Sequence, residues 1–345
     1  MWKSSVSCSK LRKMTTSVDR NALIASFLTR HGWDPATRVR IAGDASFRKY
    51  DRLKDNGNTA ILMDAPPPQE DVRPFIRIAR HLYERGFSVP DIFAEDVTAG
   101  LLLLEDLGDD TYTRLLARGH DERALYTLAT DTLIALHGTA DAVPSGVQPY
   151  ALPRQLEEVN RLHVWYLKML GVTLSPDVIA EYEQLWEALL PHAEQVPTSL
   201  ILFDYHVDNL LLIPGRKGVK ACGLLDFQDA VAGPVTYDLM SLLEDARRDI
   251  NPTLVADMKQ RYRAAFPAVG ADAFNLSWAV MAAQRHTRVI GTFARLKLRD
   301  NKPHYLVHIP RLWRYMDMCL AHPALSDLKA WFDAQVPTQL RVVPS

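Results

Sequence analysis

Three side chains that could support phosphoryl transfer occur within one short stretch of the chain. Asp204 and Asn209 lie five positions apart after an apolar run, and Asp226 directly follows a later apolar run. Phosphoryl transfer requires little covalent chemistry from a protein, because one carboxylate orients the acceptor hydroxyl while an amide and a second carboxylate hold magnesium on the phosphates. We therefore predict that Asp204 is the catalytic residue and that Asn209 and Asp226 are magnesium ligands.

The elements around these residues are predicted to bring them together. Residues 199–203 form an apolar lead-in, and residues 210–213 and 219–225 are predicted strands joined by a turn rich in glycine and proline. A hairpin of this kind returns the chain, so Asp226 is expected to face Asn209. Because a D-x4-N spacing alone arises about once by chance in a chain of this length, the prediction depends on its combination with the hairpin and the final aspartate.

The same stretch resembles the aminoglycoside phosphotransferase-like small-molecule kinases, whose catalytic segment usually reads His-Gly-Asp-x-His-x-x-Asn. Residues 202–209 read Leu-Phe-Asp-Tyr-His-Val-Asp-Asn, so Asp204, His206 and Asn209 match, whereas the first His and the Gly are absent. Residues 226–229 and 237–239, Asp-Phe-Gln-Asp and Tyr-Asp-Leu, match the downstream pattern. The resemblance implies ATP and Mg²⁺ as cofactors. It also implies an α+β, two-lobed, protein-kinase-like fold with a small β-rich N-lobe and a larger, mostly helical C-lobe.

Within this family the chain is most similar to the anomeric sugar kinases that phosphorylate N-acetylmuramate and N-acetylglucosamine at the C1 hydroxyl in peptidoglycan recycling. Residues 43–50, 103–108, 284–286 and 291–296 carry this similarity, which spans roughly residues 20–320. It implies an amino sugar as the acceptor, without ranking the two sugars or fixing the anomer. Two alternatives stay open: a kinase of another small hydroxyl acceptor, of the aminoglycoside or choline type, and a catalytically silent pseudokinase.

Polar residues near the predicted centre allow more than one role. Asp238 either caps the helix predicted at 239–247 or braces the catalytic loop. Asp208 and Asp229 are either partners of the metal site or solvated loop residues. His206 either supports the loop through its ring nitrogens or contacts the acceptor. We retain His206 and Asp229 as candidate acceptor residues.

The N-terminal part follows the order of a kinase small lobe. A helix is predicted at 18–31, strands at 38–42, 49–53 and 59–63, and a helix at 70–85. We predict an N-lobe over 18–104, a hinge over 105–110 and a C-lobe over 111–345. Residues 1–17 are expected to be a disordered extension or a misassigned start, since they lack the apolar core of a signal peptide.

Nucleotide binding is assigned to one loop and to the hinge. The loop at 43–48 would cover the ATP phosphates, with Ser46, Phe47 and Arg48 as candidates, although a plain strand connection would look the same. The Glu105 carbonyl and the Leu107 N–H could bind adenine, unless this is an ordinary strand and turn. Kinases usually place a phosphate-binding lysine on the third strand, where this chain has a methionine. No ion pair with Glu70 or Glu84 is predicted.

Acceptor recognition is assigned to a helix expected at 272–298, which carries Arg285, His286, Arg288 and Arg295. A planar guanidinium would suit the lactyl carboxylate of N-acetylmuramate, although a solvated helix face would look the same. We name Arg285 and His286 as candidates. The aromatic residues at 163–166 could stack on a sugar ring, but aromatics at helical spacing also form cores.

Composition limits the class of partner. The 345 residues include 40 Lys plus Arg and 41 Asp plus Glu, so the formal charge of −1 gives no basis for a nucleic-acid or acidic-lipid surface. The longest apolar runs are far shorter than the roughly 20 residues that span a bilayer. Three widely separated cysteines favour a reducing cytoplasm. We therefore expect a cytoplasmic protein with a small-molecule substrate, whose oligomeric state stays open.

Overall fold

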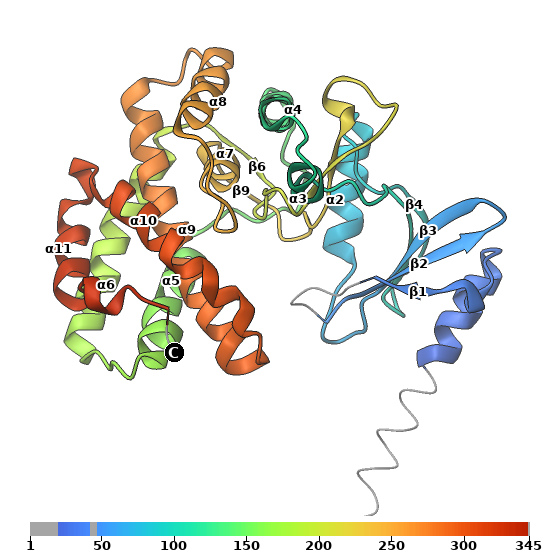
Figure 1. Ribbon diagram of the computed structural model, residues 1–345, viewed down its shortest axis with the longest axis horizontal. Helices are drawn as coiled ribbons and strands as arrows, with labels where there is room; N and C mark the ends of the chain where they lie inside the picture. The colour runs from blue at the N-terminus through green and yellow to red at the C-terminus, as the bar shows by residue number, and fades with distance from the viewer. Residues whose placement is uncertain (1–19, 42–46, 344–345) are drawn as a thin grey trace, which may run out of the picture. The chain divides into compact units, whose positions relative to one another are not determined.

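The computed structural model describes residues 20–41 and 47–343 and divides the chain into two compact units, residues 1–108 and 109–345. The first unit contains a five-stranded sheet, and the second is mostly helical (Figure 1). The predicted α+β class is therefore confirmed. The extension predicted at 1–17 and the candidate Ser46 lie outside the described residues. No helix of the described part is long and apolar enough to cross a membrane.

The sheet of the first unit is antiparallel throughout, with the order β1-β2-β3-β5-β4. Its strands β2 and β3 are each longer than predicted and form a hairpin that turns at Asn56-Gly57, where both residues have positive φ. The bounds are β1 (Val39–Arg40), β2 (Lys49–Asp55), β3 (Asn58–Asp64), β4 (Ile92–Asp96) and β5 (Leu101–Glu105), with helix α2 at Arg73–Glu84.

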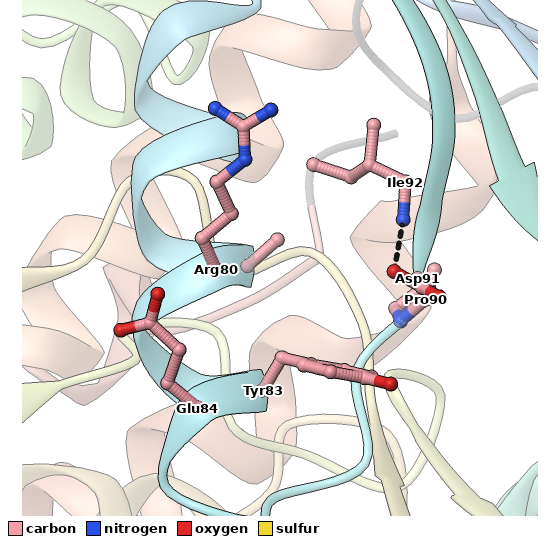
Figure 2. Close-up of a pocket in the computed structure, with 7 residues that line it drawn as sticks. Arg80, Tyr83, Glu84, Pro90, Asp91 and Ile92 are labelled. Carbon is pink, nitrogen blue, oxygen red and sulfur yellow. Dashed lines mark hydrogen bonds between the residues drawn. The ribbon is translucent and has the colours of Figure 1, made fainter.

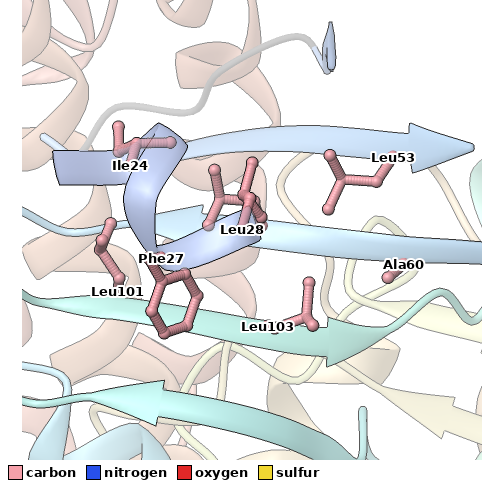
Figure 3. Packing of buried hydrophobic residues seen from close by; sticks show 8 residues of the cluster. Ile24, Phe27, Leu28, Leu53, Ala60, Leu101 and Leu103 are labelled. Carbon is pink, nitrogen blue, oxygen red and sulfur yellow. The ribbon is translucent and has the colours of Figure 1, made fainter. Parts of the chain in front are cut away.

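A helix at residues 20–30 packs its apolar side against this sheet (Figure 3). Ile24, Phe27 and Leu28 have the i, i+3, i+4 spacing that places side chains on one helix face. The strand residues that they meet lie two positions apart on β3 and β5, as one face of a pleated sheet requires. The resulting cluster is completed by Leu53, Ala60, Leu62, Leu101 and Leu103, each at most 2% exposed.

Helix α2 begins at Arg73, three residues later than predicted. Pro74 occupies the first turn, where a missing N–H costs nothing. In a helix that began at Glu70, Pro74 would lie in the interior and could not donate to the Glu70 carbonyl. Glu70 consequently lies in a non-helical segment ahead of the helix.

The second unit combines helices with two short antiparallel strand pairs, β6 with β9 and β7 with β8. The strands are β6 (Thr198–Ile201), β7 (Leu210–Leu212), β8 (Cys222–Leu224) and β9 (Val231–Pro234). The α-helices are α3 (Tyr112–Ala117), α4 (Glu122–His137), α5 (Leu152–Arg161), α6 (Pro176–Leu189), α7 (Thr236–Leu243), α8 (Pro252–Ala265), α9 (Ala271–Asp300), α10 (Ile309–Leu320) and α11 (Ser326–Gln335). A π-helix, η2 (Leu162–Leu167), continues α5.

The strand predicted at 219–225 is only partly correct. A 3-10 helix occupies Gly218–Ala221, and β8 begins at Cys222. Gly218 has a φ of 57°, a left-handed conformation that ends the extended path, so the turn is longer than the five residues predicted. The apolar alternation of residues 219–221 therefore does not correspond to a strand.

Helix α9 forms the centre of the second unit and packs against α5, α7, α10 and η2. One close contact depends on a glycine. A Cβ added at Gly291 would lie 2.4 Å from the carbonyl carbon of Arg161 and 2.5 Å from its oxygen, which are backbone atoms that cannot rotate away. Gly291 therefore allows α9 to approach the junction of α5 and η2.

We predict that Gly291→Ala destabilises the protein by about 1–3 kcal/mol, because overpacking outweighs the gain in helix propensity of about 1 kcal/mol. The free energy of unfolding from urea denaturation measures the effect. Gly270→Ala is the matched control, since nothing lies within 4 Å of the added carbon. If Gly291→Ala proved as stable as the wild type, the close approach of α9 to Arg161 would be wrong.

Candidate active site

The catalytic segment runs from the end of β6 to the start of β7. The carbonyl of Asn209 accepts a hydrogen bond from the Leu225 N–H at 2.9 Å, directly beyond the paired residues Leu210 and Leu224. This register brings Asp226 beside Asn209. The Asn209 Nδ2 donates to the carbonyl oxygen of Asp204 at 2.9 Å. The hairpin and this side-chain bond thus hold the three predicted residues in one place.

Two residues of this segment have backbone conformations that side chains other than glycine rarely adopt. Phe203 has a φ of 76° and Asp226 a φ of 58°. Each such backbone conformation destabilises the fold by on the order of 1–3 kcal/mol. It persists only where contacts with the surrounding structure stabilise it. Both adjoin or belong to the predicted centre, so the strained conformations coincide with the residues expected to do chemistry.

The side chains of Asn209 and Asp226 suit magnesium. Because the Asn209 Nδ2 is engaged with Asp204, the Oδ1 is the atom of this amide that remains to bind a cation. One Asp226 oxygen accepts from the Gln228 Nε2 at 2.9 Å. In the described part of the chain, no three His, Cys, Asp or Glu residues gather as a metal site. Magnesium uses few protein ligands and completes its shell with phosphate oxygens and water, so one carboxylate and one amide fit it.

Asp238 braces the catalytic segment. Its carboxylate accepts hydrogen bonds from the backbone N–H groups of Leu202 at 2.6 Å and Phe203 at 3.0 Å. It lies within α7, whose N-cap is Val235, so the alternative of a helix cap is wrong. Complete burial raises the pKa of Asp238 to about 7, against the opposing effect of the two N–H donors. This buried carboxyl fixes the backbone just before Asp204.

Other residues anchor the remainder of the segment. The Tyr205 hydroxyl donates to the carbonyl of Ala129 on α4 at 2.8 Å. Asp208 pairs with the Arg247 Nε at 2.7 Å and accepts from the Thr113 hydroxyl, so it is held by partners of its own. Asp229, a candidate acceptor residue, is exposed and accepts from Gln228 at 3.3 Å. Nothing in these contacts assigns Asp229 to an acceptor.

His206 is a buried and neutral component of the segment. Burial lowers its pKa well below the ordinary value, and the nearby guanidinium groups of Arg247, Arg285 and Arg288 act in the same direction. Its Nε2 lies 3.4 Å from the Asn209 Nδ2. These contacts are those of a residue that supports the side-chain amide of Asn209.

The two acceptor candidates on α9 are both buried. Arg285 is 2% exposed, and its Nε and Nη1 have no hydrogen-bond partner among the described residues. His286 is fully buried, bonds Glu244 at 2.7 Å and stacks on Tyr315. The alternative that Arg285 and His286 lie on a solvent-exposed face of this helix is therefore wrong. The observed partners of His286 are protein groups, Glu244 and Tyr315, so we do not include it in the proposed acceptor site.

An ion pair that the sequence did not reveal occurs in the first unit. The Arg48 Nε lies 3.2 Å from the Glu70 Oε2, and the Phe47 N–H donates to the Glu70 Oε1 at 3.1 Å. No ion pair was predicted for Glu70, because no lysine is available at the usual position; its partner is an arginine from the preceding loop. Met63, at the position of the usual lysine, is 1% exposed and belongs to the core.

The predicted hinge residues follow directly on β5. Glu105 ends that strand, and the side chain of Leu107 is buried. The Asp106 carboxylate accepts from the Gly108 N–H at 3.1 Å and pairs with the Arg52 Nε at 2.8 Å. The bonds of Asp106 to Gly108 and Arg52 hold the backbone that would present the Glu105 carbonyl and the Leu107 N–H to a base.

A separate small hollow lies between α2 and the segment leading into β4 (Figure 2). It encloses about 90 Å³, well below the roughly 300–1,000 Å³ of small-molecule pockets. None of the predicted site residues lines it. Its lining comprises Ala79, Arg80, Tyr83, Glu84, Pro90, Asp91 and Ile92.

Comparison with known proteins identifies the family of this chain. Residues 37–271 match the model of the phosphotransferase enzyme family. A protein of Caulobacter vibrioides named N-acetylmuramate/N-acetylglucosamine kinase is 37% identical over 362 residues, covering 95% of this chain and 100% of that protein.

Solved structures show a similar fold at low identity. A choline/ethanolamine kinase family protein from Mesorhizobium loti has a TM-score of 0.60 and 17% identity, covering 91% of this chain and 98% of that one. The streptomycin-ATP-APH(2")-IIa ternary complex has a TM-score of 0.55 and 16% identity, covering 88% of this chain and 97% of that one.

Proposed function

Because the chain belongs to the phosphotransferase enzyme family, we propose that it is an ATP- and Mg²⁺-dependent kinase that phosphorylates the anomeric C1 hydroxyl of N-acetylmuramate, N-acetylglucosamine or both. The observations that carry the proposal are the hydrogen bond from the Asn209 Nδ2 to the Asp204 carbonyl and the β7–β8 register, which places Asp226 beside Asn209 along the backbone. The acceptor class is supported by the Caulobacter relative, which aligns over its entire length.

In the proposed reaction, Asp204 orients the acceptor hydroxyl and accepts its proton as the oxygen attacks phosphorus. Its side chain is 35% exposed, which leaves the carboxylate accessible to a sugar. The Asn209 amide oxygen and the Asp226 carboxylate would hold the cation. Bound there, Mg²⁺ supplies charge that offsets the phosphate oxygens and the transferred group. Asp238 and Tyr205 keep the backbone around Asp204 in place.

The surroundings of Asp204 bear on the choice of acceptor. Arg288 lies 3.8 Å from its Oδ1, and Arg247 and Arg285 are close enough to lower the pKa of the neighbouring His206. A polycationic aminoglycoside or a choline headgroup would meet like charge here, at a cost of free energy. A neutral or anionic sugar would not. The arginines therefore favour a neutral or anionic N-acetylated sugar over the cationic acceptors.

Phosphorus NMR of the purified protein tests the proposal directly. With ATP, Mg²⁺ and a panel of free sugars, we expect an anomeric sugar phosphate to form only with N-acetylmuramate or N-acetylglucosamine. Choline and an aminoglycoside serve as the negative controls. Formation of a phosphate at another carbon, or turnover confined to a cationic acceptor, would overturn the assignment. Loss of ATP without any sugar phosphate would point to hydrolysis alone.

A further inference from the structure

Two guanidinium groups meet one aromatic ring immediately beside the proposed catalytic carboxylate. The Cζ of Arg154, on α5, lies 4.6 Å from the centre of the Phe203 ring, and the Cζ of Arg288, on α9, lies 4.1 Å from it. Phe203 directly precedes Asp204, and the Arg288 Nη2 lies 3.8 Å from the Asp204 Oδ1. Elements distant in sequence thus place two guanidinium groups against the residue that precedes Asp204, and one of them also lies within 4 Å of the Asp204 carboxylate.

Both arginines lie near the carboxylate of Glu158. The Arg154 Nε lies 3.2 Å and the Arg288 Nε 4.0 Å from the carboxylate of Glu158, which is 2% exposed. Although burial acts to raise it, the pKa of Glu158 is held below its usual value by Arg288 and the Tyr150 hydroxyl. Glu158 is therefore ionised, and it also accepts from the Tyr150 hydroxyl and the Gln284 Nε2, so its two oxygens are already engaged. The other carboxylate near Arg288 is that of Asp204, at 3.8 Å.

One guanidinium donor of this pair has no hydrogen-bond partner among the described residues. The side chain of Arg288 is 9% exposed, and its Nε has no hydrogen-bond partner within the described residues. A buried charged donor without a partner costs about 1–3 kcal/mol or more, so such a group usually serves a ligand or an ordered water. Arg154 lies nearer to solvent, with 37% of its side chain exposed. The pair therefore offers one buried and one accessible guanidinium to an incoming group.

The chemistry of the pair selects an oxyanion. Guanidinium groups bind carboxylates and phosphates with paired, charge-assisted hydrogen bonds. Two oxyanions come near Asp204 in the proposed reaction: a carboxylate on the acceptor and the transferred phosphoryl group. In the proposed reaction Asp204 contacts the acceptor hydroxyl, whereas Asn209 and Asp226 hold the cation on the phosphates. Of these three residues, Asp204 is the one that Arg288 approaches, at 3.8 Å. The arginines therefore match the acceptor.

We propose that Arg154 and Arg288 form an anion subsite that binds the lactyl carboxylate of N-acetylmuramate next to Asp204 and favours this sugar over N-acetylglucosamine. The proposal rests on the proposed function, and it names the group that distinguishes the two sugars. N-acetylglucosamine lacks the lactyl ether and its carboxylate but has the same reacting hydroxyl. The accessible Arg154 is the residue expected to determine selectivity, whereas Arg288 also lies against the catalytic carboxylate.

Steady-state kinetics of Arg154→Gln with both sugars tests the subsite. We expect kcat/KM for N-acetylmuramate to fall about 10- to 100-fold, mostly through KM, because a charge-assisted hydrogen bond is lost. For N-acetylglucosamine the fall in kcat/KM should stay below about threefold, because the substitution removes no contact with this sugar. Arg154→Lys should recover part of the loss, since it restores the charge but not the planar geometry.

The matched control is Arg161→Gln. Arg161 lies on the same helix and also pairs with a glutamate four residues away, Glu157, at 3.1 Å. This variant should leave the ratio of kcat/KM values for the two sugars unchanged. The methyl ester of N-acetylmuramate provides a measurement that needs no variant. Wild-type protein should discriminate against the ester, and Arg154→Gln should treat the ester and the acid nearly alike.

The possible outcomes distinguish a failure of the anion subsite from a failure of the proposed sugar kinase function. Equal losses with both sugars in Arg154→Gln would place Arg154 at the phosphoryl group or in loop support and would overturn the subsite. Unchanged kinetics with both sugars would overturn it as well. If the wild-type protein phosphorylated neither sugar, the proposed function itself would fail, independently of Arg154.

Discussion

Asp204→Asn is expected to lower kcat for the sugar by about 100- to 10,000-fold, the range that a positioned general base contributes. Asparagine keeps the shape of the side chain but cannot accept the hydroxyl proton. The free energy of unfolding should remain close to that of the wild type, because the Asp204 carboxylate is 35% exposed and its nearest cation, Arg288, lies at 3.8 Å. Initial rates of sugar phosphate formation at saturating ATP and Mg²⁺ measure the effect.

Asp177→Asn is the matched control. Asp177 is an exposed carboxylate in the first turn of α6, and its replacement should not alter turnover. The Asp204→Asn variant should still bind nucleotide, since the proposed cation ligands are Asn209 and Asp226. Calorimetry measures this binding. A variant that kept about a tenth or more of the wild-type kcat would remove Asp204 from the role of base.

The hairpin that carries Asn209 and Asp226 could be predicted because its signals are local. Two short apolar runs flanked a turn with glycine and proline, and the polar residues stood just outside the runs. Strand pairing then determines which residues face each other. The short helix at Gly218–Ala221 could not be predicted in this way, because it depends on the left-handed Gly218 rather than on any period of the apolar residues.

The family and the enzyme class were also predictable, since the matching residues lie in short motifs spread along the chain. The comparisons confirm the resemblance to aminoglycoside phosphotransferase-like kinases and the assignment as a phosphotransferase. The individual roles assigned to the site residues stay predictions, which the kinetic experiments described here address.

Contacts between distant segments could not be predicted. The pairing of Glu70 with Arg48 depends on the non-helical path after the proline run, and ion pairs between long side chains leave no periodic signal. The burial of Arg285 and Arg288 was missed for another reason, because arginine is mostly exposed in proteins. The sequence did contain a signal of this burial. The apolar residues of α9 are distributed over several faces of the helix, and a helix of that kind lies inside a domain.

Removing the Asp238 carboxylate is expected to affect stability and turnover together. In Asp238→Ala, the N–H groups of Leu202 and Phe203 lose their buried acceptor, at a cost of about 2–5 kcal/mol in the free energy of unfolding. The backbone ahead of Asp204 would no longer be held, so kcat should also fall, by about 10- to 100-fold for a misplaced catalytic group. Urea denaturation and initial rates measure the two effects.

Asp238→Asn separates the effect of the carboxylate's two acceptor oxygens from the effect of the side chain's size and shape. An amide has one oxygen, so it can accept from only one of the two N–H groups and directs its own N–H₂ toward the other. We expect a smaller loss of stability than for alanine but a comparable loss of turnover. Wild-type turnover in both variants would mean that the position of Asp204 does not depend on Asp238.

The pH dependence of stability follows from the raised pKa of Asp238, about 7 in the folded protein against about 3.9 for an aspartate in the unfolded chain. Between these values the unfolded chain has released the proton that the folded protein retains. The stability that this proton contributes is therefore fully present below pH 3.9 and is lost as the pH rises through 7. The loss has a slope of at most about 1.4 kcal/mol per pH unit, and it should be absent in Asp238→Asn.

Turnover should change in the opposite direction over the same range. Only the ionised carboxylate offers both oxygens as acceptors to Leu202 and Phe203, so the geometry ahead of Asp204 is complete only above pH 7. We expect kcat to rise with an apparent pKa near 7 in the wild type. In Asp238→Asn this rise should disappear while kcat stays low. An unchanged profile in that variant would assign the titration to a different group and leave Asp238 a purely structural residue.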